Sequence, residues 1–212
     1  MSRLLELVAV MDRLRVECPW DRQQTHRSLA RYLLEETYET LEAIEGHREG
    51  DGPAHLREEL GDLLLQVVFH ARIASERPVE EGGFDVEDVA GGIVDKLVHR
   101  HPHVFAGLEV ADAEEVDRNW EALKAAEKQR TGLLEGVPPA LPALAWADKV
   151  LDRLERAGRA PNLPAGRGVG EELLALVGRA REEGLDPEQE LREAVRRVVG
   201  EPGSEGPGRA LG

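Results

Sequence analysis

The segment from Leu56 to Ile73 is apolar almost all the way round at helical spacing, and this pattern constrains the fold most strongly. One flank of the expected helix consists of Leu56, Leu60, Leu63, Leu64 and Val67, and the other of Leu65, Val68 and Phe69. A narrow polar stripe runs between the flanks at positions i, i+3, i+7 and i+11, namely Glu59, Asp62, Gln66 and His70. A helix that is hydrophobic on most faces is normally buried, and buried carboxylates are costly unless they are paired or bind a cation. The pattern therefore predicts a buried helix whose acids bind a cation.

A second acidic motif, Glu35-Glu36-Thr37-Tyr38-Glu39, lies upstream on another expected helix. Glu36 and Glu39 lie one helical turn apart on one face, as do Glu59 and Asp62. If the two helices are antiparallel, the four carboxylates converge and suit a hard cation such as Mg²⁺ or Mn²⁺. Glu35 projects further out, where it can act on a water molecule at the metal. The alternative interpretations are a solvated helix face and a di-iron site, but a di-iron site needs Glu-x-x-His motifs that these acids lack.

The composition of the 212 residues limits the protein's compartment and partners. Hydrophobic residues make up 41% and charged residues 33%, no apolar stretch is long enough to span a membrane, and the start lacks a signal-peptide pattern. The single cysteine, Cys18, excludes an internal disulfide framework. We therefore expect a cytoplasmic protein without a membrane partner. A net charge of −15 argues against a nucleic-acid polymer as partner, but allows a nucleotide that binds together with divalent cations.

Helical periodicity dominates the chain, and no run alternates with the period of a half-buried strand. The fold class is therefore predicted to be all-α. Expected helices cover residues 4–15, 28–45, 54–76, 86–101, 113–129, 143–157, 171–183 and 187–199, with Asp85 and either Thr25 or Ser28 as N-caps. Residues 132–142, with three prolines, are predicted to be a linker, and the Gly-rich residues 200–212 a disordered tail. A leucine pattern near Glu172 repeats that of residues 62–72 without the acidic pair.

Two further groups are candidates for substrate binding. Lys96 and Arg100 lie four residues apart on one helix, where they can bind phosphate oxygens. The alternative is that they only complement the helix dipole. Trp20 and Trp120 can stack on a nucleobase, and core packing is the alternative for each. The sequence lacks a Gly-rich phosphate loop, so a triphosphate would have to be bound by metal and basic side chains.

Several short motifs, taken together, resemble those of the MazG family of nucleoside triphosphate pyrophosphohydrolases. They are Cys18-Pro-Trp-Asp21, Leu34-Glu-Glu-Thr-Tyr-Glu39, Glu59-Leu-Gly-Asp-Leu-Leu64, Asp95-Lys-Leu97, Arg100-His-Pro-His-Val-Phe105 and Gly136-Val-Pro-Pro-Ala-Leu-Pro142. The ordered match covers residues 3–150. Each motif alone is common, but the combination is highly specific.

The resemblance implies a helical bundle of the all-α NTP pyrophosphatase type, assembled as an intertwined homodimer. It implies Mg²⁺-dependent hydrolysis of NTPs or dNTPs to the nucleoside monophosphate and pyrophosphate, in nucleotide-pool housekeeping. The implied metal ligands are Glu36, Glu39, Glu59 and Asp62, with Glu35 in the same catalytic cluster, and Lys96 and Arg100 fall at the family's phosphate contacts.

The chain departs from the family pattern after its first domain. Residues 1–131 are expected to form the MazG-like domain, and residues 143–199 a shortened second copy that lacks both acidic motifs. His99 also stands where the family commonly has a second arginine. A catalytically weak helical module that binds a nucleotide or a protein partner is therefore the alternative function. The sequence does not define the preferred base or sugar, the number of metals, the role of the second region or the physiological role.

Overall fold

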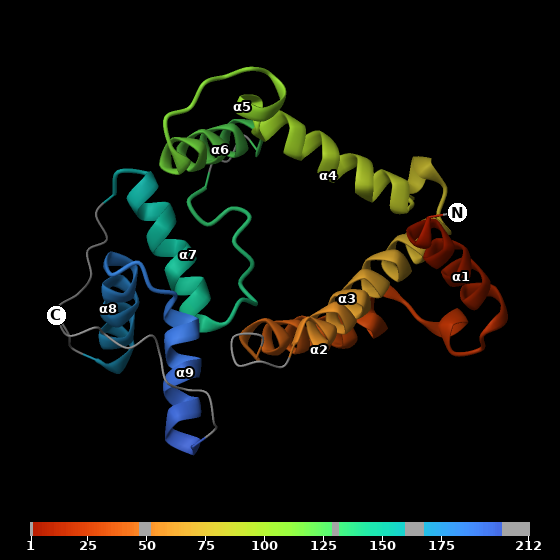
Figure 1. Ribbon diagram of the computed structural model, residues 1–212, viewed down its shortest axis with the longest axis horizontal. Coiled ribbons are helices and arrows are strands. Elements are labelled where there is room, and N and C mark those ends of the chain that lie inside the picture. Colours follow the sequence, from red (N-terminus) through yellow and green to blue (C-terminus); the bar gives the residue numbers. More distant parts are fainter. Residues whose placement is uncertain (1, 47–51, 129–131, 160–167, 201–212) are drawn as a thin grey trace. The chain divides into compact units, whose positions relative to one another are not determined.

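The structure, a computed structural model, describes residues 2–46, 52–128, 132–159 and 168–200. Within these ranges every regular element is helical, as predicted, and there is no β-strand. The elements are α1 (Arg3–Glu17), η1 (Asp21–Gln23), α2 (His26–Gly46), α3 (Gly52–Ala74), η3 (Val79–Glu81), α4 (Val86–Arg100), α5 (Pro102–Phe105), α6 (Ala113–Lys128), α7 (Ala143–Arg156), α8 (Val169–Glu182) and α9 (Pro187–Val199) (Figure 1). The predicted long helices agree with these bounds to within about two residues, which is the usual uncertainty of helix ends. No helix in the described ranges is long and apolar enough to cross a membrane.

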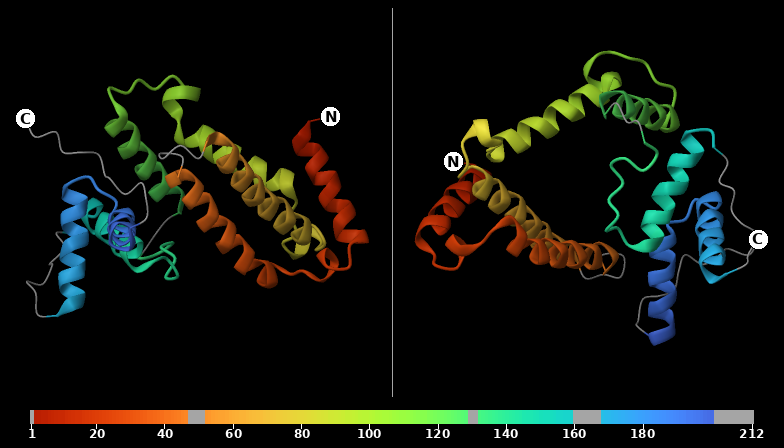
Figure 2. Two further views of the ribbon diagram at one scale, coloured as in Figure 1. Left: turned by 60° about the horizontal axis from the view of Figure 1, so that its bottom comes forward. Right: turned by 180° about the vertical axis from the view of Figure 1, so that it is seen from behind.

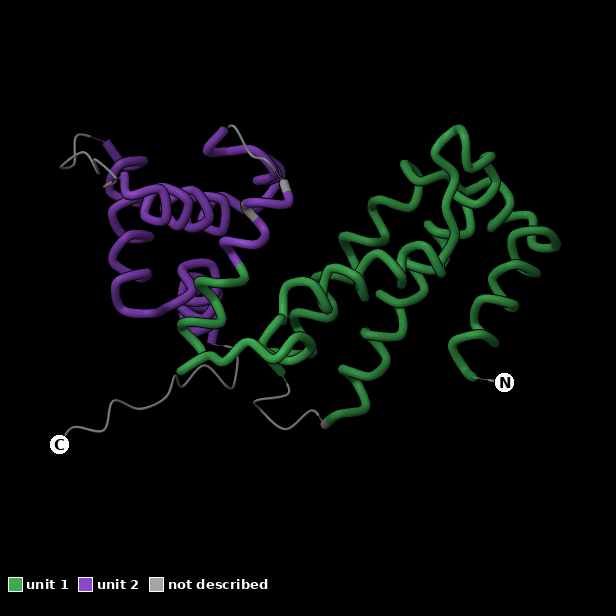
Figure 3. Tube along the Cα trace, turned by 90° about the horizontal axis from the view of Figure 1, so that it is seen from above, with its two compact units in different colours: residues 1–120 green, residues 121–212 purple. Residues whose placement is uncertain are grey.

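The chain divides into two compact units, Met1–Trp120 and Glu121–Gly212 (Figure 3). The division falls inside α6, whereas the predicted domain boundary at residue 131 lies outside the described residues. In the second unit α7, α8 and α9 pack on one another, and Leu151 and Val177 are buried. Arg153 on α7 donates hydrogen bonds to the carbonyl oxygens of Leu133 and Glu135, so the segment predicted to be a linker packs against this helix. The predicted tail lies outside the described residues, apart from Gly200.

The antiparallel pair α2 and α3 is the central element of the first unit (Figures 1 and 2). Thr25 and Ser28, the two predicted caps of α2, both take part in its N-terminal capping. The backbone N–H of Ser28 donates to Thr25 Oγ1 at 3.1 Å, and that of Thr25 donates to Ser28 Oγ at 2.9 Å. This reciprocal arrangement is a capping box, in which each side chain satisfies a free backbone donor.

The core of the first unit lies where α1, α2 and α3 meet. It consists of Met11, Leu29, Val68 and Phe69, all at most 4% exposed. Burial of an aliphatic or aromatic side chain of this size contributes about 1.5–3 kcal/mol relative to an exposed one. This cluster therefore fixes α1 and α2 on the same part of α3.

Arg15 joins α1 to the end of α3 and to the loop before α2. Its guanidinium group is buried and forms two hydrogen bonds with the Glu76 carboxylate, at 2.6 Å and 2.9 Å. It also donates to the carbonyl oxygens of Asp21 and Gln24. The hydrogen bond from Arg15 lowers the pKa of the Glu76 carboxyl group. Arg15 thus fixes the loop that contains Trp20 against the helices.

The helix α3 is only half buried within this chain, which corrects the expectation that it is buried on all sides. On one flank Val68 and Phe69 are 4% and 3% exposed. On the other flank Leu60, Leu64 and Val67 are 50%, 36% and 44% exposed. The sequence pattern cannot distinguish burial within one chain from burial against another chain.

The helix α4 begins at the predicted cap and presents an uncovered apolar face. The Asp85 carboxylate accepts hydrogen bonds from the backbone N–H groups of Glu87 and Asp88, completing a capping box. Residues 87–99 are all exposed, including the apolar side chains at Val89, Ile93 and Leu97. Although α4 ends as predicted before Pro102, a short helix that was not predicted, α5, begins at that proline. Proline suits the first turn of a helix because no intrahelical acceptor is available there.

Candidate metal centre

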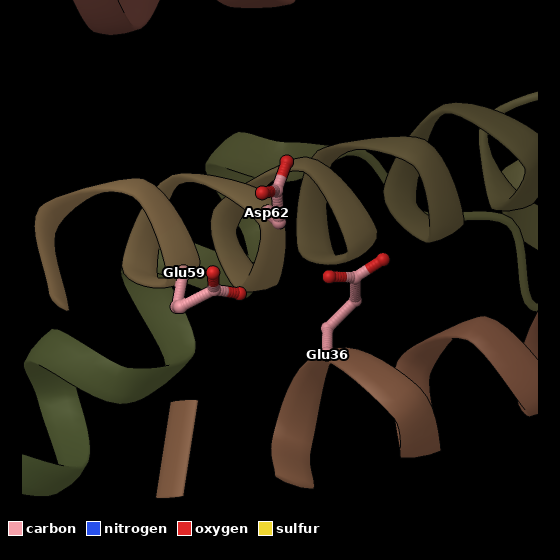
Figure 4. A group of neighbouring side chains, drawn as sticks. All are labelled: Glu36, Glu59 and Asp62. Atoms are coloured by element: carbon pink, nitrogen blue, oxygen red, sulfur yellow. The ribbon is translucent and has the colours of Figure 1, made fainter. Parts of the chain in front are cut away.

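Three carboxylates from two helices converge in the first unit (Figure 4). Glu36 projects from α2, whereas Glu59 and Asp62 project from α3. One carboxylate oxygen of each residue lies within 4.8 Å of those of the other two. All three belong to the four acids that helical spacing predicted to converge, and antiparallel packing of α2 and α3 brings them together.

Thr40 links the two helices beside these carboxylates. Its side chain is buried, and its Oγ1 lies 2.8 Å from the carbonyl oxygen of Glu36 and 3.4 Å from that of Glu59. A threonine hydroxyl in a helix commonly donates to the carbonyl four residues earlier. Here it is also within reach of the backbone of the facing helix. Thr40 therefore sets how α2 and α3 lie next to the acids.

Glu59 is the most buried of the three acids. Its residue is 8% exposed, and His55 Nδ1 lies 3.3 Å from Glu59 Oε1, one turn away on α3. This contact is an ion pair only when the histidine is protonated. A neutral imidazole leaves the buried carboxylate without a compensating charge, and an uncompensated buried charge is unfavourable.

The environment of Glu36 opposes its ionisation. Burial raises the pKa of the Glu36 carboxyl group, and the negative charge of Asp62 raises it further. The charge of Glu39, a hydrogen bond with Glu39 and the charge of Glu59 act in the same direction. A divalent cation at this point would relieve this repulsion. Carboxylates held this close together raise one another's pKa, and a bound cation would favour their charged forms.

The remaining two predicted acids lie at the edge of this cluster. Glu39 is exposed and shares a hydrogen bond with Glu36, so it is close to the group although it is not among the three converging carboxylates. Glu35 is exposed on α2. The structure thus places Glu36 inward and Glu35 outward, as the helical geometry predicted.

The donor set fits a hard divalent cation. Carboxylate oxygens are the ligands that Mg²⁺, Mn²⁺ and Ca²⁺ prefer, and Mg²⁺ usually combines a few carboxylates with water and substrate phosphates. Glu36, Glu59 and Asp62 supply three such groups within reach of one ion. We conclude that this cluster can hold a metal ion.

The predicted phosphate and base contacts on α4 and α6 have different environments. Lys96 is exposed on α4. Arg100 is 5% exposed, and its guanidinium carbon lies 5.1 Å from the ring centroid of Trp120. The His101 ring meets Trp120 edge-on at 4.9 Å. The Trp120 ring therefore packs against two side chains at the end of α4, and the roles of these residues in substrate binding stay predictions.

Trp20, the other predicted base contact, lies at the surface beside the α2–α3 pair. It is 50% exposed, and its ring centroid lies 5.9 Å from that of Tyr32 and 6.5 Å from that of Phe69. Arg31 lies over the Tyr32 ring, with its guanidinium carbon 4.4 Å from the ring centroid. Trp20 is therefore an exposed aromatic surface supported by a second aromatic ring.

Two residues beside the acids, Thr40 and His55, were not predicted from the sequence. Thr40 follows Glu36 by four residues, and His55 precedes Glu59 by four. Side chains at this spacing are neighbours on a helix. That spacing is the only signal in the sequence, and it is too common to identify either residue without the packing of α2 on α3.

Comparisons with known proteins bear on the family of the chain. Residues 24–105 match the sequence model of a family described as the MazG nucleotide pyrophosphohydrolase domain. This matched segment contains all five predicted acids, Lys96 and Arg100, and excludes both tryptophans. It therefore coincides with the elements that position the carboxylate cluster.

Named relatives from two organisms are similar over most of the chain. The nucleoside triphosphate pyrophosphohydrolase of Mycobacterium tuberculosis is 45% identical over 92% of this chain and 55% of its own length. The chain thus spans about half of that relative. The nucleoside triphosphate pyrophosphohydrolase/pyrophosphatase MazG of Thermotoga maritima is 36% identical over 92% of this chain and 82% of its own length. A crystal structure of a mazG-related protein from Thermotoga maritima matches 57% of this chain and 97% of its own, with a TM-score of 0.46 and 28% identity.

Proposed function

The chain belongs to the MazG family, and on this premise we propose that it hydrolyses nucleoside triphosphates to nucleoside monophosphates and pyrophosphate. The observation that supports this proposal most strongly is the convergence of Glu36, Glu59 and Asp62 within 4.8 Å. We propose Mg²⁺ as the ion, with Mn²⁺ as a substitute. Glu39, next to Glu36, is the proposed fourth ligand.

The proposed reaction is a direct attack of water on the α-phosphorus. Mg²⁺, when bound, supplies charge neutralisation for the phosphate chain and lowers the pKa of a water molecule. Glu36, Glu39, Glu59 and Asp62 would hold the ion and thereby fix the α-phosphate between α2 and α3. Glu35 is exposed beside them and is the proposed acceptor of the proton from the attacking water. The bond from the α-phosphorus to the bridging oxygen breaks, and pyrophosphate leaves with that oxygen.

Positive charge is needed where pyrophosphate leaves, and we propose Lys96 and Arg100 as its source. The Lys96 ammonium group is exposed and can adapt to a phosphate. Arg100 is buried against Trp120, so its proposed role includes ordering the end of α4. Trp20 and Trp120 are the proposed base contacts.

We further propose that the protein is a homodimer. Leu60, Leu64 and Val67 on α3 and the apolar face of α4 are exposed in the single chain. Apolar side chains that stay exposed over several turns of a helix often mark an interaction site. A second copy would cover both helices.

The test is analysis of products and turnover with purified protein, a panel of NTPs and dNTPs, and Mg²⁺. We expect equimolar monophosphate and pyrophosphate from the wild type, and loss of turnover in Glu59→Gln and Asp62→Asn. Glu58→Gln makes the same change at the exposed neighbour on α3 and should retain activity. The Glu59→Gln variant should melt no lower than the wild type without metal, because the substitution removes a buried charge. Nucleotide binding without turnover would instead support the binding-module alternative.

A further inference from the structure

The polar stripe of α3 continues beyond the acidic cluster. Gln66 lies four residues after Asp62, and His70 lies four residues after Gln66. Side chains at this spacing are neighbours along one helix face. The stripe therefore leads from the acids through Gln66 to His70.

Both of these residues contain a buried polar atom without a hydrogen-bond partner among the described protein atoms. Gln66 is 6% exposed, and its Oε1 is unpaired. His70 Nε2 is likewise buried and unpaired. Most buried polar side-chain atoms in folded proteins have a partner, so such exceptions require a specific explanation. Two exceptions on one stripe, adjacent to a candidate metal centre, indicate a ligand that supplies the partners.

His70 is fixed by His26, the first residue of α2. The two Nδ1 atoms lie 2.8 Å apart, the ring planes are within 3° of parallel, and the ring centroids are 5.1 Å apart. The rings therefore meet edge to edge and share one hydrogen between the Nδ1 atoms. If His26 donates it, neutral His70 has its own hydrogen on Nε2, and if His70 donates, its Nε2 is an acceptor. The hydrogen bond between the two histidines therefore allows His70 Nε2 to donate to a ligand or to accept from one.

Aromatic rings lie at the same level of the helix pair. Thr40 faces Glu59, and His26 faces His70, which fixes the antiparallel register of α2 and α3. Interpolation between these contacts places Gln66 level with residues 30–32 of α2, which include Tyr32. The Tyr32 ring supports the half-exposed ring of Trp20. Hydrogen-bonding groups and a stacking surface thus occur together, one to two turns beyond Asp62.

We propose that Gln66 and His70 recognise the nucleoside half of the substrate, with Trp20 as the stacking surface. This inference rests on the proposed function, in which the acids hold the phosphate end. The hydrogen-bonding partner belongs either to the sugar or to the base edge. Gln66 is one turn from Asp62 and His70 two turns, so a nucleotide with its α-phosphate at the acids would extend along this stripe.

The test compares ligands with and without a nucleoside. Calorimetric titration in Mg²⁺ would measure binding of an NTP analogue with a non-hydrolysable α,β-bridge and of inorganic tripolyphosphate. Gln66→Met preserves the length and helix propensity of the side chain and removes its hydrogen-bonding groups. We expect about three- to tenfold weaker binding of the nucleotide analogue, the effect of one lost hydrogen bond, and unchanged binding of tripolyphosphate. Gln189→Met makes the same change on α9 and should leave both affinities unchanged.

Further measurements distinguish nucleoside recognition by Gln66 and His70 from a purely structural role of these residues and from the proposed hydrolysis. Ribose and deoxyribose analogues, and a series of bases, distinguish sugar recognition from base recognition, because the Gln66→Met loss should depend on one of them. His70→Phe should give the same selectivity for the nucleoside ligand. An equal loss for tripolyphosphate, or no loss for the nucleotide, would overturn the proposal. Because binding is measured, the result does not depend on turnover, and a fall in melting temperature would identify a folding defect.

Discussion

At the scale of single residues, the raised pKa of Glu36 is the clearest electrostatic sign of the acidic cluster. Burial and three neighbouring carboxylates all disfavour its charged form. Folding without a cation therefore forces together groups that repel one another at neutral pH. A cation-binding function explains why such an arrangement is present, because the ion compensates the repulsion.

This environment makes the effect of Glu36→Gln depend on pH. The pKa of Glu36 is raised in the folded chain above its ordinary value of 4.5, so its favourable contribution to folding is present below that pH. The contribution is lost as the pH rises through the raised value. In EDTA, the melting temperature of Glu36→Gln minus that of the wild type should be small at pH 4.5 and increase toward neutral pH. Saturating Mg²⁺ should stabilise the wild type more than the variant.

The matched control is Glu42→Gln, an exposed position on the same helix, which should change the melting temperature at neutral pH less than Glu36→Gln does. If the melting-temperature difference between Glu36→Gln and the wild type stays constant from pH 4.5 to neutral pH, the raised pKa of Glu36 is contradicted.

The sequence allowed the candidate acids to be predicted because helical spacing alone puts Glu59 beside Asp62. It also predicted the orientations of Glu35 and Glu36, which follow from their positions relative to the apolar face. Thr40 and His55 could not be predicted, because their roles depend on the register between α2 and α3. The burial of Arg100 against Trp120 could not be predicted either, because it depends on how the chain returns from α5 to α6.

At the scale of elements, local signals defined the helices but not all of their neighbours. Capping boxes and prolines gave the bounds of the long helices, since these are local interactions. The four residues of α5 escaped prediction because one helical turn is too short to show periodicity. The sequence could not show which flank of α3 stays uncovered, because an apolar pattern does not specify which chain covers it.

The contact between α2 and α3 gives a prediction for Thr40→Val. The substitution removes a buried hydroxyl that contacts the carbonyl oxygens of Glu36 and Glu59, and should lower the free energy of unfolding by about 1 kcal/mol. It should also weaken Mg²⁺ binding, because the spacing of the two helices sets the spacing of the acids. Denaturant unfolding and metal titration measure the two effects.

Thr37→Val is the matched control, since its exposed hydroxyl donates only to the Leu33 carbonyl oxygen within α2. Equal effects of the two variants on metal affinity would show that Thr40 does not position the acids.

At the scale of the whole molecule, the candidate metal centre belongs to one of the two compact units. The acids, Lys96 and Arg100 all belong to the first unit. The second unit has its own packing between α7, α8 and α9, including ion pairs from Arg181 to Asp148 and Glu155. The leucine pattern near Glu172 recurs there without an acidic pair, so we expect one metal centre per chain.

The proposed dimer predicts a mass in solution of twice the 23.4 kDa of one chain. Light scattering at micromolar concentration measures this mass. Leu64→Lys should shift the protein toward the monomer, because it places a charge in the apolar flank that the second copy would cover. Val79→Lys, at a position 79% exposed on η3, is the control and should remain dimeric. A monomeric wild type would contradict the proposed pairing.

In the proposed reaction the acids direct water to the α-phosphorus of a nucleoside triphosphate. Hydrolysis in water enriched in oxygen-18, followed by mass spectrometry of both products, identifies the phosphorus that the water attacks. We expect the label in the nucleoside monophosphate and none in the pyrophosphate. Label in the pyrophosphate, or release of nucleoside diphosphate and inorganic phosphate, would contradict it.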